Sequence, residues 1–143
     1  MLFIPNIFWA VFRPKEGASG LATETISLVV FERFGQISTT LFSVITQDIH
    51  QALSCRIVWF IASLGAMVLY EVSWIRYFRG GKTAKDLYRS LSWIPIPLAT
   101  LPIVGFLLLS IYEKNAWLLI SVVILGIGHI GIHLQHREHL RMA

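Results

Sequence analysis

The 143-residue chain is poor in charged side chains and nearly without cysteine. Only 14% of its residues are charged, against about 25% in an average soluble domain. In contrast, 55% are hydrophobic, and they come in long runs. This imbalance excludes an ordinary water-soluble core and is typical of a membrane protein. The single cysteine, Cys55, excludes an internal disulfide and a Cys-x-x-Cys redox or metal pair.

Acidic residues are also scarce, with eight Asp and Glu against twelve Lys and Arg, for a net charge of +4. In a membrane protein such a surplus reports topology and contact with anionic lipid rather than nucleic acid. The N-terminal MLFIPNIFWAVF lacks a basic region before its apolar part, which argues against a signal peptide. Because twelve residues are too short to cross a hydrocarbon core of about 30 Å, we expect residues 1–12 to form a half-inserted or interfacial segment.

Four apolar stretches follow, and we interpret them as transmembrane helices. They cover about residues 25–47, 57–78, 91–112 and 116–136. The third contains Pro95, Pro97 and Pro102, which remove backbone donors and disfavour the preceding helical turn, so its first part should be extended, kinked or broken. The sequence therefore predicts a single all-α domain over 1–143: an integral membrane four-helix bundle with an additional short N-terminal hydrophobic segment.

Basic residues set the expected orientation of these spans. The loop at 76–89 contains Arg76, Arg79, Lys82, Lys85 and Arg89, against one acid. Such a loop is expected on the cytoplasmic side, where it also contacts anionic lipid. With four spans, both termini then lie inside. We expect a multi-pass protein of a bacterial cell membrane.

Polar residues from three of the spans converge at one depth in this topology. At about 1.5 Å per residue, Glu32 and Glu71 each lie roughly 10 Å from the cytoplasmic surface, and His129 reaches a similar depth. The expected site residues are Glu32, Gln36, Tyr70, Glu71, Trp74, His129 and His133. Ionisable groups inside a membrane are costly and commonly functional. We interpret the cluster as a ligand-binding pocket, the alternative being a purely structural cluster that holds the bundle together.

Several occupants of this pocket fit its chemistry. A divalent metal is one of them, with a ligand set of His129, His133, Glu32 and Glu71. The two histidines share a helix face at the i, i+4 spacing of helical zinc sites. His136 lies on the same face and extends the set, although a solvated tail is the default interpretation of its position. Without a metal, the acids and aromatic rings can counter the charge of a cationic ligand.

The main prediction is therefore a cytoplasm-facing pocket that binds or transports a small ligand or ion. Two other classes stay open: a membrane enzyme performing acid–base chemistry on a lipid-soluble substrate, and a structural, accessory or immunity-type protein without chemistry. The run Gly126-Ile-Gly-His-Ile-Gly131 spells G-x-G-x-x-G, but too few residues follow it for a dinucleotide-binding unit. Its glycines instead predict the close approach of another helix beside His129.

Three short motifs carry a resemblance to known proteins. Ile4-Pro5-Asn6, Glu32-Arg33-Phe34-Gly35-Gln36 and Gly128-His129-Ile130 together resemble a group of small, uncharacterised, multi-pass bacterial membrane proteins. The resemblance covers most of the chain and implies a class without an activity. In that group Ile-Pro-Asn ends a full first helix, whereas almost nothing precedes it here. The pocket chemistry is also similar to that of emopamil-binding membrane proteins, as an analogy of parts without a matching motif.

Overall fold

The computed structural model describes residues 24–45, 56–91, 94 and 96–142. Within these residues the fold is all-α, as predicted, and contains no strand beyond an isolated bridge between Leu91 and Ile94. The helices are α2 (Ile26–Ile45), α3 (Ile57–Arg79), α4 (Ala84–Leu87), α5 (Pro97–Glu113) and α6 (Ala116–Met142). The predicted interfacial segment at 1–12, the end of the first predicted span and Cys55 lie outside the described residues.

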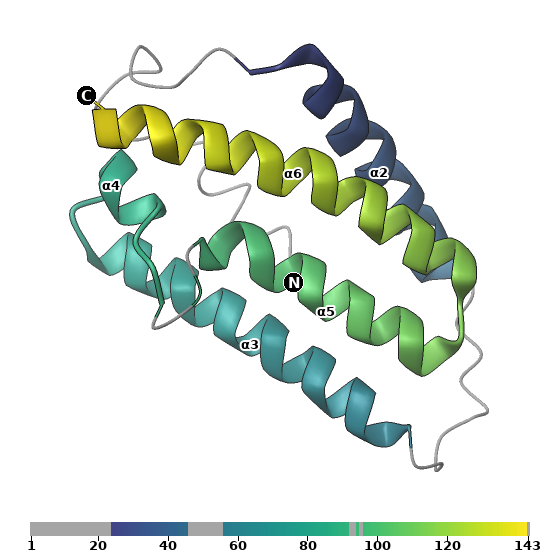
Figure 1. The fold of residues 1–143 in the computed structure, drawn as a ribbon. Coiled ribbons are helices and arrows are strands. Elements are labelled where there is room, and N and C mark those ends of the chain that lie inside the picture. The colour runs from purple at the N-terminus through teal and green to yellow at the C-terminus, as the bar shows by residue number, and fades with distance from the viewer. Residues whose placement is uncertain (1–23, 46–55, 92–93, 95, 143) are drawn as a thin grey trace.

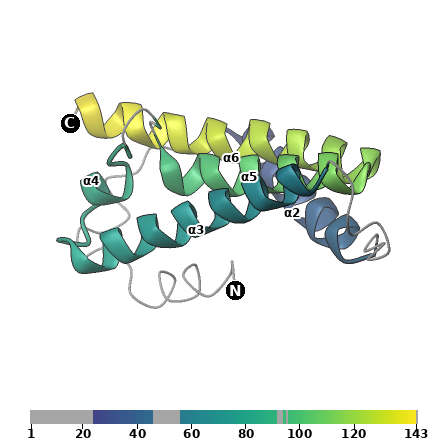
Figure 2. The same cartoon turned by 90° about the horizontal axis from the view of Figure 1, so that it is seen from below.

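Helix α6 lies between α2 and α5, and α3 packs on the other side of α5 (Figure 1). The order across the molecule is therefore α2, α6, α5 and α3, and the close helix pairs are α2–α6, α5–α6 and α3–α5. The short helix α4 lies near the C-terminal end of α6 in both ribbon views (Figures 1 and 2). This arrangement separates α2 from α3 and brings the loop around α4 to one end of α6.

Three helices, α2, α3 and α6, are long and apolar enough to cross a membrane, which indicates a multi-pass membrane protein. They carry large exposed apolar side chains such as Phe34, Val68 and Ile120, which are suited to contact with lipid. The fourth predicted span is shorter, because α5 has 17 residues and begins at Pro97. Proline is favoured at the first helical position, since its missing N–H has no helical partner there. The described residues of the first part of 91–112, Leu91, Ile94 and Ile96, are not helical, as predicted.

A short turn joins α5 to α6 and is stabilised by local hydrogen bonds. Lys114 adopts the left-handed conformation with φ 54° and ends α5, donating its N–H to the carbonyl of Ile111. Asn115 then accepts the N–H of Leu118 on its side-chain oxygen at 3.0 Å. This side-chain bond satisfies a free donor in the first turn of α6. The turn makes α5 and α6 antiparallel neighbours, so the histidines near the far end of α6 lie close to the start of α5.

Candidate functional site

Two glycines let α2 and α6 approach so closely that polar side chains on both helices meet. A Cβ added at Gly128 of α6 would lie 2.3 Å from the backbone nitrogen of Glu32. A Cβ added at Gly35 of α2 would lie 2.4 Å from the backbone nitrogen of Leu125. Real Cβ atoms do not come this near to backbone atoms, so the packing requires glycine at both positions. The predicted role of the α6 glycines is confirmed at Gly128.

Next to this crossing, Glu32 of α2 and His129 of α6 form a direct polar pair. The Oε1 atom of Glu32 lies 2.6 Å from Nδ1 of His129. The side chains are 21% and 25% exposed, respectively. A carboxylate only accepts hydrogen bonds, so Nδ1 of His129 carries the proton of this contact. The sequence placed these two residues at the same level of the bundle, and the structure shows their side chains in contact.

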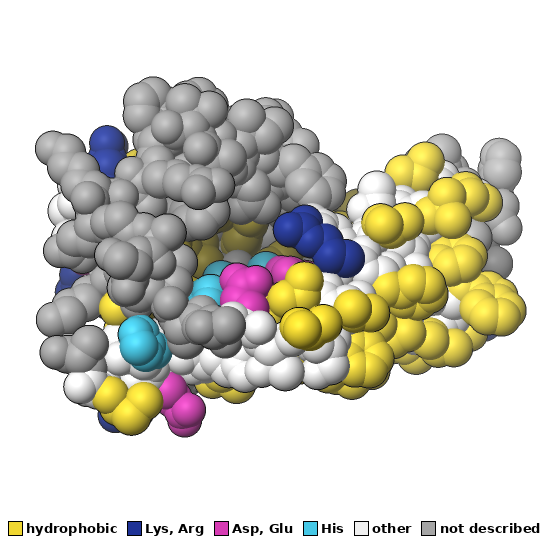
Figure 3. Space-filling model, turned by 90° about the horizontal axis from the view of Figure 1, so that it is seen from above, with side chains coloured by type: hydrophobic (Ala, Val, Ile, Leu, Met, Phe, Trp, Pro, Cys, Tyr) yellow, Lys and Arg dark blue, Asp and Glu magenta, His cyan; other side chains and the backbone are white. Residues whose placement is uncertain are grey.

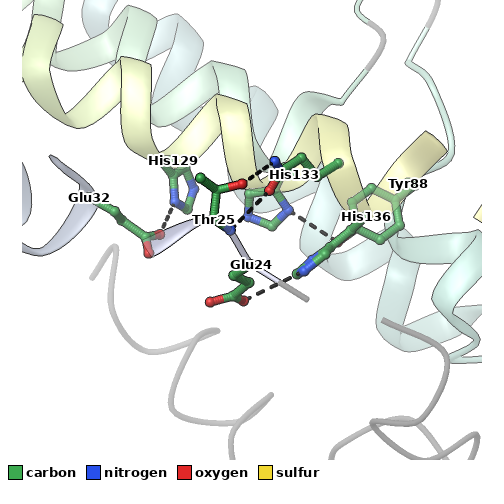
Figure 4. A network of polar contacts seen from close by, with 8 residues as sticks. Glu24, Thr25, Glu32, Tyr88, His129, His133 and His136 are labelled. Atoms are coloured by element: carbon green, nitrogen blue, oxygen red, sulfur yellow. Dashed lines mark hydrogen bonds and ion pairs between the residues drawn. The ribbon is translucent and has the colours of Figure 1, made fainter. Parts of the chain in front are cut away.

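A second polar group lies further along α6, where Tyr88 contacts two histidines (Figure 4). The phenol oxygen of Tyr88 lies 3.1 Å from Nδ1 of His136 and 3.3 Å from Nδ1 of His133. Tyr88 and His136 are buried, at 7% and 5% exposure. His133 also connects this group to the first, because its ring lies edge-on to that of His129 with centroids 4.6 Å apart.

The end of the network towards the chain surface is formed by residues at the start of α2. Nε2 of His136 lies 3.6 Å from a carboxylate oxygen of Glu24, within ion-pair distance. Beside it, the side chain of Gln135 donates to the hydroxyl of Thr25 at 2.7 Å and accepts the Thr25 N–H at 3.4 Å. These contacts hold the start of α2 against the last turns of α6. Figure 3 shows acidic and histidine side chains gathered at a hollow on this face of the molecule.

The loop at 80–91 holds Tyr88 against the histidines of α6. A capping box formed by Thr83 and Asp86 orders this loop. The Asp86 carboxylate accepts the N–H and the hydroxyl of Thr83 at 3.3 and 3.0 Å, while the Asp86 N–H donates to the Thr83 hydroxyl at 3.2 Å. These bonds from Thr83 lower the pKa of Asp86 below its ordinary value of 3.8. Arg76 adds hydrogen bonds to the carbonyls of Arg89 and Ser90.

Tyr88 itself is fixed by apolar packing from α5 and α6. It forms a cluster with Ile96 and Ala99, against which Leu87 and Leu140 also pack. Burial raises the pKa of the Tyr88 phenol well above its ordinary value, and the nearby Glu24 carboxylate adds to the shift. The phenol is therefore neutral at physiological pH, and it acts as one hydrogen-bond donor and as an acceptor.

The remaining predicted site residues are not gathered around Glu32. Tyr70 and Trp74 are buried on α3 in an apolar cluster with Tyr77, Leu98 and Leu101. Glu71 is half-buried on α3, which packs on α5, whereas Glu32 lies at the α2–α6 contact. Gln36 is exposed on α2. The structure thus brings together Glu32, His129 and His133, and places the aromatic residues in a separate core.

The predicted metal ligands His129, His133, Glu32 and Glu71 are likewise not assembled as one set. Among the described residues, no group of three or more histidine, cysteine, aspartate or glutamate side chains is placed to hold a metal ion. Helix packing explains the difference for Glu71, since α3 packs on the far side of α5 from α6. The site that the structure offers is a line of hydrogen-bonding groups rather than a coordination sphere.

Two members of the line, Tyr88 and Glu24, were not predicted, and His136 was predicted only as an extension of the metal set. The default interpretation of His136 as part of a solvated tail is wrong, because α6 continues to Met142 and the 80–91 loop buries this side chain. Its i+3 spacing from His133 was the available signal. For Tyr88, the signal was one aromatic residue in an otherwise hydrophilic loop. Glu24 precedes the first span and carried no such signal.

Comparison with known proteins adds no relative to this description. No known protein family matches the chain, and neither does any curated protein or solved structure. The functional interpretation therefore rests on the geometry of the α2–α6 site.

Proposed function

We propose that this chain is a four-span protein of a bacterial cell membrane, with both termini inside, that binds a small cation at Glu32 in exchange for a proton. The 2.6 Å contact between Glu32 and His129 carries the proposal. Three helices suited to crossing a membrane and the basic loop at 76–89 support its membrane setting and orientation.

The exchange follows from the charge of the pair. A carboxylate and an imidazole ring holding two protons have no net charge together, and a group without net charge costs less in a low-dielectric setting than one with a net charge. A cation bound to the Glu32 carboxylate makes the group positive. Loss of the ring proton from His129 restores neutrality. One monovalent cation is therefore exchanged for one proton, and His129 is the proton donor.

Proton release in weakly buffered detergent solution tests this function. Sodium, potassium or tetramethylammonium chloride is added to purified protein with a soluble pH indicator, and at least one of the three salts should release protons from the wild-type protein. Glu32→Gln should abolish the release, since an amide does not hold a cation in place of a proton. The matched control Glu138→Gln removes an exposed acid from α6, the helix that carries His129, and should leave the proton release unchanged.

A different result points to the structural alternative. If none of the three salts releases a proton or raises the melting temperature of the wild-type protein, the exchange function is refuted. The Glu32–His129 pair would then be, like the glycine contacts and the Thr25–Gln135 bonds, one of the interactions that hold α2 against α6.

A further inference from the structure

We propose that Tyr88 connects His133 to His136 in a proton path that runs from the Glu32–His129 pair to Glu24, just before the start of α2. This inference deepens the proposed exchange, because it assigns the route by which the proton of His129 leaves. The path is built from side chains of α2, α6 and the 80–91 loop, with Glu24 just before α2, and Figure 4 shows these residues beside one another along α6.

The phenol of Tyr88 determines the direction of the hydrogen bonds. It has a single proton but contacts a ring nitrogen of both His133 and His136. It therefore donates to one ring and accepts from the other, which requires opposite tautomers of the two imidazole rings. These two contacts alone do not determine which histidine ring donates to the phenol oxygen and which accepts its proton.

Glu24 decides between the two arrangements. Its carboxylate lies 3.6 Å from Nε2 of His136, at ion-pair distance and beyond hydrogen-bond distance, and its negative charge favours the His136 tautomer that carries the proton on Nε2. Nδ1 of His136 is then the acceptor of the Tyr88 hydroxyl, and Nδ1 of His133 donates to the phenol oxygen. Nε2 of His133 is then unprotonated and can accept a proton, and its ring lies against that of His129.

The path conserves protons at every step. A proton arrives at Nε2 of His133, and Nδ1 of the same ring passes its own proton to Tyr88. Tyr88 passes its hydroxyl proton to Nδ1 of His136, and Nε2 of His136 passes one to Glu24. One proton enters and one leaves, and each intermediate group ends neutral. The rings of His129 and His133 meet edge-on, so the step between them requires one ring to rotate until its nitrogen faces the other.

Two observations set this line apart from ordinary helix-packing contacts. His136 is 5% exposed, and its buried Nε2 has no hydrogen-bond partner within the described chain, so it faces the Glu24 carboxylate with a donor still free. Buried polar groups are normally hydrogen-bonded, and an exception calls for a functional reason. Tyr88 belongs to the 80–91 loop, and its ring already packs on Ile96 and Ala99. This apolar packing would hold the loop in place without the two histidine contacts, so the loop does not need them.

A pH jump followed by infrared spectroscopy tests the path in the full-length protein. The carbonyl band of protonated Glu32 is assigned by its loss in Glu32→Gln, and its rise is timed after rapid acidification. In Tyr88→Phe the rise should slow by about tenfold or more, to the same final amplitude, because the ring stays but the relaying hydroxyl is gone. Tyr112→Phe is the matched control, since this tyrosine packs at a tilt against Phe60 at the opposite end of α5. Its rate should equal that of the wild type.

Equal rates in Tyr88→Phe and the wild type refute the path. If Tyr88→Phe does not fold, His133→Gln interrupts the same line and is subject to the same criterion. The pH jump involves no added salt, so the outcome is separate from that of the cation experiment. If Tyr88→Phe slows protonation but no salt releases a proton, the path is supported and the exchange is refuted. If a salt releases protons but Tyr88→Phe does not slow protonation, the exchange is supported and the path is refuted.

Discussion

The contact between Glu32 and His129 joins two groups that an apolar setting tolerates only as a pair. Removing one partner leaves the other without its charge-assisted hydrogen bond, whereas replacing both leaves two neutral amides that can bond to each other. We expect Glu32→Gln and His129→Gln each to lower stability in detergent and the double variant to recover much of the loss. The coupling energy should be about 1–3 kcal/mol in a double-mutant cycle, measured by denaturant unfolding.

His139→Gln serves as the control for this cycle. It removes an imidazole from the same helix ten residues further on, and it should show no coupling to Glu32→Gln. Additive effects of Glu32→Gln and His129→Gln would contradict the contact.

At the scale of the helix, the α2–α6 pair depends on the absence of a side chain at Gly128. In Gly128→Ala the new methyl group would overlap the backbone of Glu32 and Leu28, so the helices must separate. We expect a loss of about 1–3 kcal/mol in the free energy of unfolding, as for other overpacking substitutions. Gly65→Ala is the matched control, because its Cβ would meet nothing within 4 Å on α3. It should gain about 0.5–1 kcal/mol, since alanine is the better helix former, and similar losses in both variants would contradict the close approach.

The capping box of the 80–91 loop gives that element a pH dependence. The pKa of Asp86 is lower in the folded chain than its ordinary value, because Thr83 donates to the carboxylate. Its stabilising effect is therefore complete above the ordinary pKa and is lost as the pH falls through the lower folded value. We expect the melting temperature of the wild type to exceed that of Asp86→Asn above about pH 5, with the difference shrinking below about pH 4. A difference that is constant down to pH 3 would show that the carboxylate makes no such contact.

The helices could be predicted from this sequence, but their neighbours could not. Long apolar runs encode the helices, and Pro97 marks the start of α5 because proline favours the first helical turn. Distance along the helices placed Glu32 and His129 at one level correctly. The same calculation placed Glu71 there too, since depth carries no information about which helices adjoin. Tyr88 depends on a loop folding back onto α6, a long-range contact that leaves no local periodicity.

At the scale of the whole molecule, the basic loop and the α5–α6 turn are expected on opposite sides of the membrane. Arg79 ends α3 at the loop end, and Lys114 lies in the turn between α5 and α6. In a Cys55→Ser background, Arg79→Cys and Lys114→Cys each provide one thiol on an exposed residue. Since basic loops stay in the cytoplasm, a membrane-impermeant maleimide added to intact cells should label Lys114→Cys only. Arg79→Cys should react only after the cells are opened. Labelling of Arg79→Cys in intact cells would invert the orientation and place Glu24, the proposed outlet of the proton path, on the outer side.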